Sequence, residues 1–328
     1  MKKIYLTLPL ILLFLGCSSN VFDPKVVIGK RSLTAEYDKK ITMQHLEGIT
    51  YDDGKVVTLA GEVAKVTLPK EFAFLNETKK YLIAADNGGQ ILLIEKDNGQ
   101  QKKITFTHRV LSANMDGDLL AVVTVKNSMQ VYDISKEKLL FKFASSEVIA
   151  VDSRLANPVF NQGLIFFPSL DGKVQIYSKD QKKMIRTMSI STEDKFNNVI
   201  FFKVMSKKII AATGSALYLF GKEIVKKELP IRSVLDDGKA LLIVGKDGTI
   251  ARYTLELKQK NSLKLKFAHI VGAIETPLNI YMIESEGFMI KINKDLSMHL
   301  VYKFDFDDQK IFSGNDRFYL SDGYFLPH

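Results

Sequence analysis

The sequence predicts an all-β fold, a β-propeller of about eight four-stranded blades. From about residue 55 onward, short apolar segments with period-two alternation recur in pairs, and turn-forming residues separate the two members of each pair. In the clearest copy, Asp171-Gly172 separates residues 164–167 from residues 173–177, and Asp-Gly supplies the positive φ angles that a tight hairpin turn requires. The copies recur about every 40 residues, the length of one propeller blade, which cannot bury both faces without neighbours.

The turn of each copy defines the period. Seven turn positions follow one another at steps of 33 to 44 residues, with a mean of 39: Gly89, Ser128, Gly172, Ser215, Gly248, Gly287 and Gly323. An earlier, less regular copy is expected around Gly61, so the sequence is compatible with eight blades and, as an alternative, with seven. A β-sandwich is disfavoured, because its strands would not form hairpins at so regular a long period. No segment sustains helical periodicity over three turns, so few helices are expected.

The first residues predict a lipoprotein signal peptide over residues 1–16. Two lysines precede the mostly apolar stretch Ile4–Gly16, which at 13 residues is short for a membrane span of roughly 20. Phe14-Leu15-Gly16-Cys17 resembles the bacterial lipobox, although Phe14 replaces the usual leucine, and Cys17 is the only cysteine in the chain. We therefore expect lipidation at Cys17, a lipidated flexible tether over residues 17–30 and a propeller domain over residues 31–328. By analogy with Gram-negative lipoproteins, Ser18 in place of Asp favours the outer membrane, with the protein facing the periplasm.

The composition is that of a protein with a large core and excludes several classes. The 328 residues are 46% hydrophobic and 25% charged, which excludes a disordered or collagen-like chain. A single cysteine excludes an intramolecular disulfide scaffold, a cysteine-based zinc finger and an iron–sulfur cluster.

One copy of the repeat carries a family resemblance. Pro158-Val159, Gly163, Asp171-Gly172 and the polar turn at residues 179–182 resemble the unit of the quinoprotein-like (PQQ-like) propellers. A tryptophan usually packs between blades in that family, and this chain has none; we expect Phe141 and Ile185 to fill the matching places, because a wedge needs apolar bulk more than an indole. The quinone-dependent dehydrogenases of the family use a tryptophan platform and an adjacent-cysteine disulfide, both missing here, so we expect no enzyme activity and no cofactor.

The predicted lipobox, short tether and cofactor-free ring together resemble the BamB-type propeller lipoproteins of the outer-membrane β-barrel assembly machinery. The resemblance implies that a blade-entry loop grips a periplasmic domain of the barrel insertase. The corresponding loop here is residues 151–158, and Arg154 is the one residue carried across as a partner-binding candidate, one position out of register.

Other candidate chemistry is weak. The five histidines (His45, His108, His269, His299 and His328) share no metal-binding spacing, and the acidic stretch Asp305–Asp308 lacks the glycine and distal glutamate of an EF-hand, so no metal site is expected. No nucleophile elbow and no Walker-type phosphate loop is present. The net charge of +9 comes from dispersed lysine pairs that flank strands, where lysine discourages edge-to-edge pairing, so we expect no nucleic-acid partner. An anionic partner, such as lipid headgroups or an acidic protein surface, is the alternative interpretation of this charge.

The leading functional prediction is a non-enzymatic outer-membrane scaffold that assists the assembly of β-barrel proteins, as a monomer within a complex. The alternative is an envelope or surface lipoprotein of the same fold that binds another protein or a cell-envelope polymer. The sequence does not separate the two, because both share every feature described above.

Overall fold

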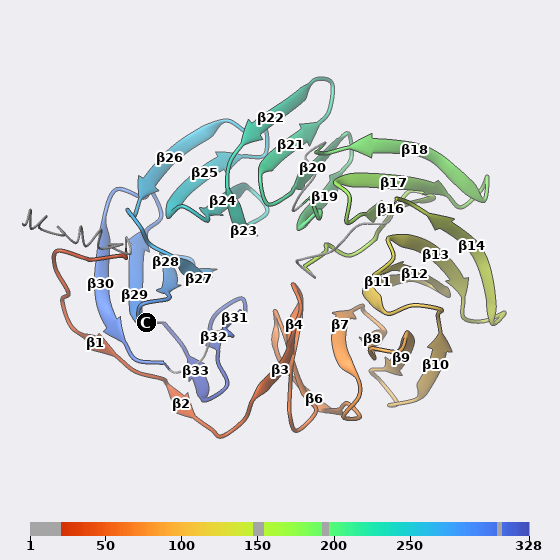
Figure 1. Cartoon of the computed structure of the whole chain (residues 1–328), viewed down its shortest axis with the longest axis horizontal. Helices are drawn as coiled ribbons and strands as arrows, with labels where there is room; N and C mark the ends of the chain where they lie inside the picture. Colours follow the sequence, from red (N-terminus) through yellow and green to blue (C-terminus); the bar gives the residue numbers. More distant parts are fainter. Residues whose placement is uncertain (1–20, 147–153, 192–196, 307–309, 328) are drawn as a thin grey trace, which may run out of the picture.

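The chain forms a ring of eight antiparallel β-sheets around a central axis, as the computed structural model shows for residues 21–146, 154–191, 197–306 and 310–327 (Figure 1). Each sheet has four strands, and one has a fifth strand at its outer edge. The predicted all-β propeller is confirmed with eight blades, and the seven-blade alternative is excluded. Within these residue ranges there is no helix, and accordingly no apolar helix of membrane-spanning length.

The strands follow the chain from the axis outward in each blade. In the first half of the ring, blade 1 comprises β3 (Ile41–Gln44), β4 (Gly48–Tyr51), β5 (Lys55–Thr58) and β6 (Gly61–Thr67); blade 2 comprises β7 (Ala73–Glu77), β8 (Tyr81–Ala85), β9 (Gln90–Glu95) and β10 (Gln101–Thr105); blade 3 comprises β11 (Val110–Asp116), β12 (Leu119–Thr124), β13 (Ser128–Asp133) and β14 (Lys138–Ala144); and blade 4 comprises β15 (Val159–Asn161), β16 (Leu164–Pro168), β17 (Lys173–Ser178) and β18 (Lys183–Ser189).

The second half of the ring repeats this plan and also includes β1 and β2, the two strands nearest the N-terminus. Blade 5 comprises β19 (Phe201–Met205), β20 (Lys208–Ala212), β21 (Ala216–Phe220) and β22 (Ile224–Glu228); blade 6 comprises β23 (Ile231–Asp236), β24 (Ala240–Gly245), β25 (Thr249–Thr254) and β26 (Gln259–Lys264); blade 7 comprises β27 (Ile270–Glu275), β28 (Asn279–Glu284), β29 (Phe288–Asn293), β30 (His299–Phe304) and the added β1 (Lys30–Arg31); and blade 8 comprises β31 (Phe312–Ser313), β32 (Phe318–Tyr319), β33 (Gly323–Phe325) and β2 (Ala35–Glu36).

The seven predicted turn positions all lie where the second strand of a blade passes to the third. The copy predicted around Gly61 is confirmed as blade 1, which spans residues 41–67; Gly61 itself begins β6, and the turn of blade 1 that matches the seven others is at Gly54, whose φ is 81°. A close approach explains the recurrence of glycine. In blade 6 the carbonyl of Gly248 accepts the backbone N–H of Leu265, and a Cβ on Gly248 would lie 2.1 Å from the carbonyl oxygen of Leu265. The turn is therefore tied to the first residue after the outer strand, at a distance that only glycine allows.

This first residue after the outer strand also fills the wedge to the next blade. The buried hydrophobic residues form eight clusters, one at each interface between neighbouring blades. Four of the residues that follow an outer strand, and Phe304 at the end of β30, are buried in such a cluster. Their N–H groups bond to the turn glycines of their blades: Leu68, Phe106, Ile190, Leu265 and Phe304. The core is therefore a circle of interfaces, and no blade is buried without its neighbours.

The two residues predicted to replace the inter-blade tryptophan behave differently. Phe141 packs on Tyr177 of the next blade, with ring centroids 4.6 Å apart. Ile185 is exposed, so its predicted wedge role was wrong. The cause is a β-bulge: Tyr177 pairs with Met184 and Ile176 with Arg186, which leaves Ile185 as the extra residue of β18. Ile190 fills the interface after blade 4 instead.

The N-terminal part of the chain closes the ring. β2 pairs antiparallel with β33, so the outer strand of blade 8 comes from the start of the chain and its three inner strands come from the end. Three further backbone hydrogen bonds join the same two segments, including one from Tyr37 N to Asp322 O of 2.9 Å. The ring is thus held shut by pairing between residues nearly 290 positions apart.

The predicted free tether needs correction in its described part, residues 21–30. Phe22 is buried between blades 6 and 7 and meets Phe288 edge to face at 5.7 Å, while Ile28 N donates to Val301 O on the edge of blade 7. Phe22, the one large hydrophobic residue of this segment that is buried, gives the chain a docking point on the ring.

We expect Phe22→Ala to release this docking point. Burial of one aromatic side chain contributes about 2 kcal/mol, and its loss should free the backbone around the exposed Lys25, so that trypsin cleaves there faster while the rest of the ring keeps its stability. Limited proteolysis with peptide mapping measures the cleavage rate after Lys25. Val26→Ala, which alters an exposed neighbour, should leave the rate unchanged, and equal rates in wild type and Phe22→Ala would contradict the docking.

Candidate interaction surface

The two faces of the ring differ in their loops. On one face, here called the linker face, lie the turns between second and third strands and the linkers from each outer strand to the next blade. The other, here called the hairpin face, carries the two remaining turns of every blade. Most linkers are short, but those after β14, β18 and β30 are longer, and residues 147–153, 192–196 and 307–309 within them lie outside the described residues. Long loops on a rigid ring are where propellers place contacts, so the linker face is the candidate surface.

Arg154, the predicted contact residue, lies half-buried in the linker between blades 3 and 4. Its Nη1 donates to the carbonyl of Arg232 in β23 at 2.8 Å, and its own carbonyl accepts from Asn198 Nδ2 at 2.9 Å. Arg154 therefore connects the linker that enters blade 4 with the linker that enters blade 5 and with β23, the innermost strand of blade 6. The rest of the predicted loop is described only from residue 154, and contact of Arg154 with a partner stays a prediction.

A group of basic side chains extends from Arg154 toward blade 7. The guanidinium of Arg232 contacts Nε2 of His269, and because guanidinium is only a donor, this nitrogen must act as the acceptor. His269 N donates to the fully buried carboxylate of Glu284, which also accepts from Glu286 N. Arg154, Arg232 and His269 thus gather charge and hydrogen-bonding groups on the linker face, although they lie in three blades and far apart in sequence. Sequence reasoning missed the last two, since nothing local distinguishes them.

A surface pocket of about 670 Å³ opens beside this group, between blades 6 and 7. Phe22 forms part of its wall, and the turn Lys266-Phe267 forms another part. Lys264 pairs with Asp247 at its edge, so the lining carries both signs of charge. The pocket is a recess where the N-terminal segment meets the linker face.

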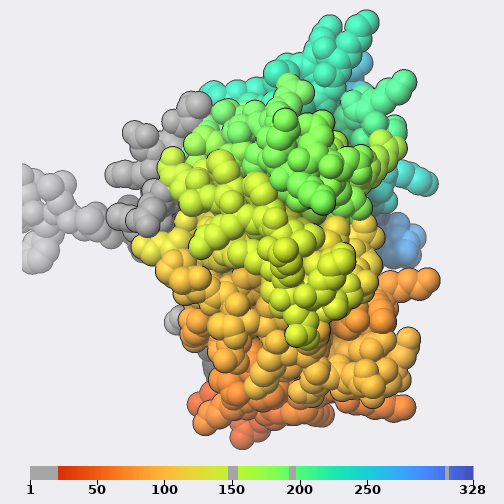
Figure 2. Space-filling view, turned by 90° about the vertical axis from the view of Figure 1, so that its right-hand side faces the viewer, coloured from red at the N-terminus to blue at the C-terminus, as the bar shows by residue number. Residues whose placement is uncertain are grey.

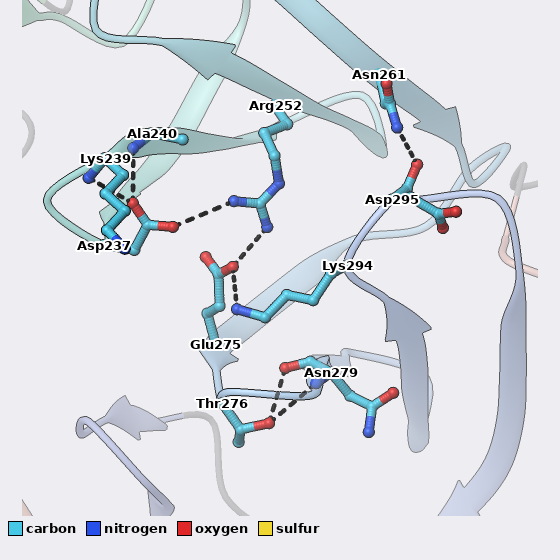
Figure 3. Close-up of polar contacts among 10 residues, drawn as sticks. All are labelled: Asp237, Lys239, Ala240, Arg252, Asn261, Glu275, Thr276, Asn279, Lys294 and Asp295. Carbon is cyan, nitrogen blue, oxygen red and sulfur yellow. Dashed lines mark hydrogen bonds and ion pairs between the residues drawn. The ribbon is translucent and has the colours of Figure 1, made fainter.

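An ionic network lies on the hairpin face, between the same two blades (Figure 3). Arg252, in the buried strand β25, reaches Glu275 at the end of β27 with an N–O distance of 2.5 Å, and Lys294 reaches the same carboxylate oxygen at 2.5 Å. Asp237 lies 3.6 Å from the other guanidinium nitrogen. Although burial raises the pKa of Asp237, the backbone N–H groups of Lys239 and Ala240 and the charge of Arg252 lower it below the ordinary value. With two cations and two carboxylates, the network is balanced and links blade to blade.

The titratable group His45 makes stability depend on pH. Burial, together with the positive charge of Arg109, lowers the pKa of His45 from 6.5 to about 4. Between these values the unfolded chain binds a proton that the folded protein does not, so the free energy of unfolding should fall as the pH falls, by about 2 kcal/mol at pH 5. Burial and the nearby Glu77 raise the pKa of Glu47, which offsets part of this loss at the acidic end.

The pH dependence of the melting temperature, measured between pH 7 and pH 4.5, tests this expectation. His45→Gln should flatten the slope, whereas a change at the exposed His299 should not. An unchanged slope in His45→Gln would assign the acid sensitivity to other groups.

Among the described residues, no group of three histidine, cysteine or acidic side chains is placed to hold a metal ion. Asp305 of the acidic stretch pairs with Lys30, while Asp307 and Asp308 lie outside the described residues. Cys17, the predicted lipidation site, also lies outside them.

Two comparisons relate the chain to known proteins, while no family model matches it. It is 30% identical over 259 residues to the plasminogen-binding protein PgbB of Helicobacter pylori strain J99, an alignment that covers 72% of this chain and 48% of PgbB. PgbB of strain 26695 matches at the same identity and covers 47% of that protein. The chain therefore spans about half the length of the curated relatives it matches.

Solved structures show the fold. BamB from Moraxella catarrhalis superposes with a TM-score of 0.66 at 14% identity, over 88% of this chain and 98% of BamB. The computationally designed Ika8 protein superposes with a TM-score of 0.63 at 9% identity, over 91% of this chain and all of that one. The predicted BamB-like β-propeller is confirmed as a fold.

Proposed function

We propose that this chain is a non-enzymatic, lipid-anchored protein of the cell envelope that binds another protein through its linker face. The relationship to PgbB is the observation that carries the proposal, because a sequence relative whose name records protein binding aligns with 72% of this chain. The geometry supports it: a closed ring with short hairpins on one face and three longer linkers on the other holds its contact groups at fixed positions.

The assembly of outer-membrane β-barrel proteins is the first candidate role. The likeness of the ring to BamB and the predicted lipobox support it. In this role the long linkers of blades 4 and 5, joined by Arg154, would contact the barrel insertase in the periplasm.

Binding of plasminogen is the second candidate role, and the 30% identity to PgbB favours it. In this role the ring would face the outside of the cell. A chain of net charge +9 would attract an acidic surface of a partner at low salt.

Two binding measurements separate the candidates. Affinity capture of the tagged full chain from crosslinked cells should recover the barrel insertase in the first role, and immobilised protein should bind purified plasminogen in the second. Arg154→Glu should weaken the binding that occurs, and Lys222→Glu, an exposed cation in the hairpin of blade 5, serves as the matched control. Failure to bind either protein would overturn both roles.

The anchor has its own test. We expect the chain to incorporate radiolabelled palmitate in cells, and Cys17→Ala to abolish the label, because Cys17 is the only thiol. Multiple acyl chains would hold the protein firmly, since each buried methylene contributes about 0.8 kcal/mol. Label that persists in Cys17→Ala would refute the anchor.

A further inference from the structure

Exposed apolar side chains gather on one side of the ring. Twelve large hydrophobic residues are exposed among the described residues, and seven of them lie on the N-terminal segment, on β30, in the turn before it or in the turn between blades 6 and 7. The six that lie on the N-terminal segment or at the start of β30 are here called the strip: Val21, Val26, Val27, Ile28, Met298 and Leu300. The N-terminal segment lies against the outer edge of blade 7, because Ile28 N bonds to Val301 O and β1 runs parallel to β30.

Phe267, the seventh residue, stands at the linker-face end of this side. Its φ of 63° is a left-handed conformation that a bulky side chain rarely adopts, and Ala268 N closes the turn on Leu265 O at 3.1 Å. Glycine or asparagine would be the ordinary choice at this turn position. In this conformation the side chain of Phe267 is 42% exposed and lies beside the pocket whose wall includes Phe22. A strained backbone conformation that leaves an aromatic side chain exposed indicates a contact site.

Cations surround the apolar side chains. Lys266 lies over the ring of Phe267 at 4.8 Å, Lys303 lies over Phe288 at 4.5 Å, and Arg31 lies over Tyr302 at 4.6 Å. Lys25 is exposed within the strip itself. Apolar and aromatic side chains flanked by lysine and arginine are the composition that sits at the boundary between acyl chains and anionic headgroups.

The chain order adds a second, independent argument. Cys17 stands four residues before Val21, and four extended residues span roughly 14 Å. A lipid on Cys17 would therefore lie within a short reach of this strip and not of the opposite rim. We propose that this side of the ring, the strip together with Phe267, rests on an anionic lipid bilayer. The inference rests on the proposed lipid anchor and adds the orientation of the ring.

The orientation has a consequence for the partner. Contact through the outer edge of blade 7 sets the ring on its edge, so that its axis runs along the membrane surface. The rim formed by β14 and β18, in yellow-green at the front of Figure 2, then faces away from the bilayer. The linker face is then perpendicular to the membrane surface and is not covered by it, so a partner at the membrane could reach Arg154.

Site-specific fluorescence tests the contact. Full-length lipidated protein carrying one introduced cysteine at position 26, 267, 139 or 185 is labelled with an environment-sensitive thiol probe and reconstituted in vesicles of three parts phosphatidylethanolamine to one part phosphatidylglycerol, with or without brominated acyl chains. Leu139 and Ile185 are the matched controls, because both are exposed apolar residues of the opposite rim. We expect brominated lipid to quench probes at 26 and 267 at least twofold more than probes at 139 and 185.

Equal quenching at all four positions, or none at 26 and 267, would overturn the orientation. The anchor is measured separately in the same experiment. An acylated Cys17 leaves the unsubstituted protein without a free thiol, so probe uptake by that protein would show that the anchor itself is absent.

Discussion

Gly323→Val is expected to lower the free energy of unfolding by about 3 kcal/mol or more, because it forces the ring open at its closure. A Cβ on Gly323 would lie 2.1 Å from the carbonyl oxygen of Ala35, on the strand that completes blade 8. No flexible side chain can give way there, since the obstacle is backbone. The pairing of β2 with β33 must separate, and the buried cluster between blades 8 and 1 then loses its cover.

Chemical denaturation measures the loss of stability, and hydrogen exchange at Thr34 and Tyr37, whose N–H groups bond across the closure, measures where it occurs. Gly117→Ala is the control: its φ of 57° is also unfavourable for alanine, but nothing lies within 4 Å of the new Cβ. We expect about 1 kcal/mol from that change. Equal effects of the two substitutions would mean that closure contributes little.

Glu275→Gln is expected to cost about 3 kcal/mol, because removing one charge leaves Arg252 and Lys294 facing each other between blades 6 and 7. The side chains of Arg252 and Glu275 are only 11% and 8% exposed, so water cannot replace the lost carboxylate. The loss should persist in high salt, since buried charges are poorly screened.

Glu256→Gln provides the comparison. Its pair with Lys208 has a similar N–O distance, 2.9 Å, but both side chains are exposed, so we expect a change below about 0.5 kcal/mol. Melting temperatures and denaturant midpoints in low and high salt distinguish the two cases. A loss at Glu275 no larger than that at Glu256 would contradict a structural role for the network.

The repeat was predictable because it depends on residues that are close to one another in the sequence. A turn with glycine in six of the eight blades recurs about every 40 residues, and the alternating strands on either side need no information from the rest of the chain. The bulge in β18 was not predictable in this way: it shifts the alternation by one residue, which moved Ile185 to solvent and Met184 inward. The copy around Gly61 was less regular because blade 1 has two glycine turns, and the one that matches the other blades is at Gly54.

The candidate surface was less predictable than the fold. Arg154 was found through resemblance, but its bond to Arg232 joins residues 78 positions apart. Arg252 could be singled out locally, because it is a charged residue within a buried apolar strand and such a charge requires a partner of opposite charge. Which carboxylate supplies it depends on the packing of two blades, which no single segment records. Phe22 likewise lies in a short segment before the first repeat, and nothing in that segment records the interface between blades 6 and 7 that buries it.

Photocrosslinking in cells tests the central claim most directly, namely that the linker face binds a protein. A photoreactive phenylalanine analogue is placed at Arg154 on the linker face or at Leu278, an exposed residue in the hairpin between β27 and β28 on the hairpin face, and the adducts are identified by mass spectrometry. The account predicts a defined protein adduct from position 154 and none from position 278. Adducts from position 278 alone would contradict it.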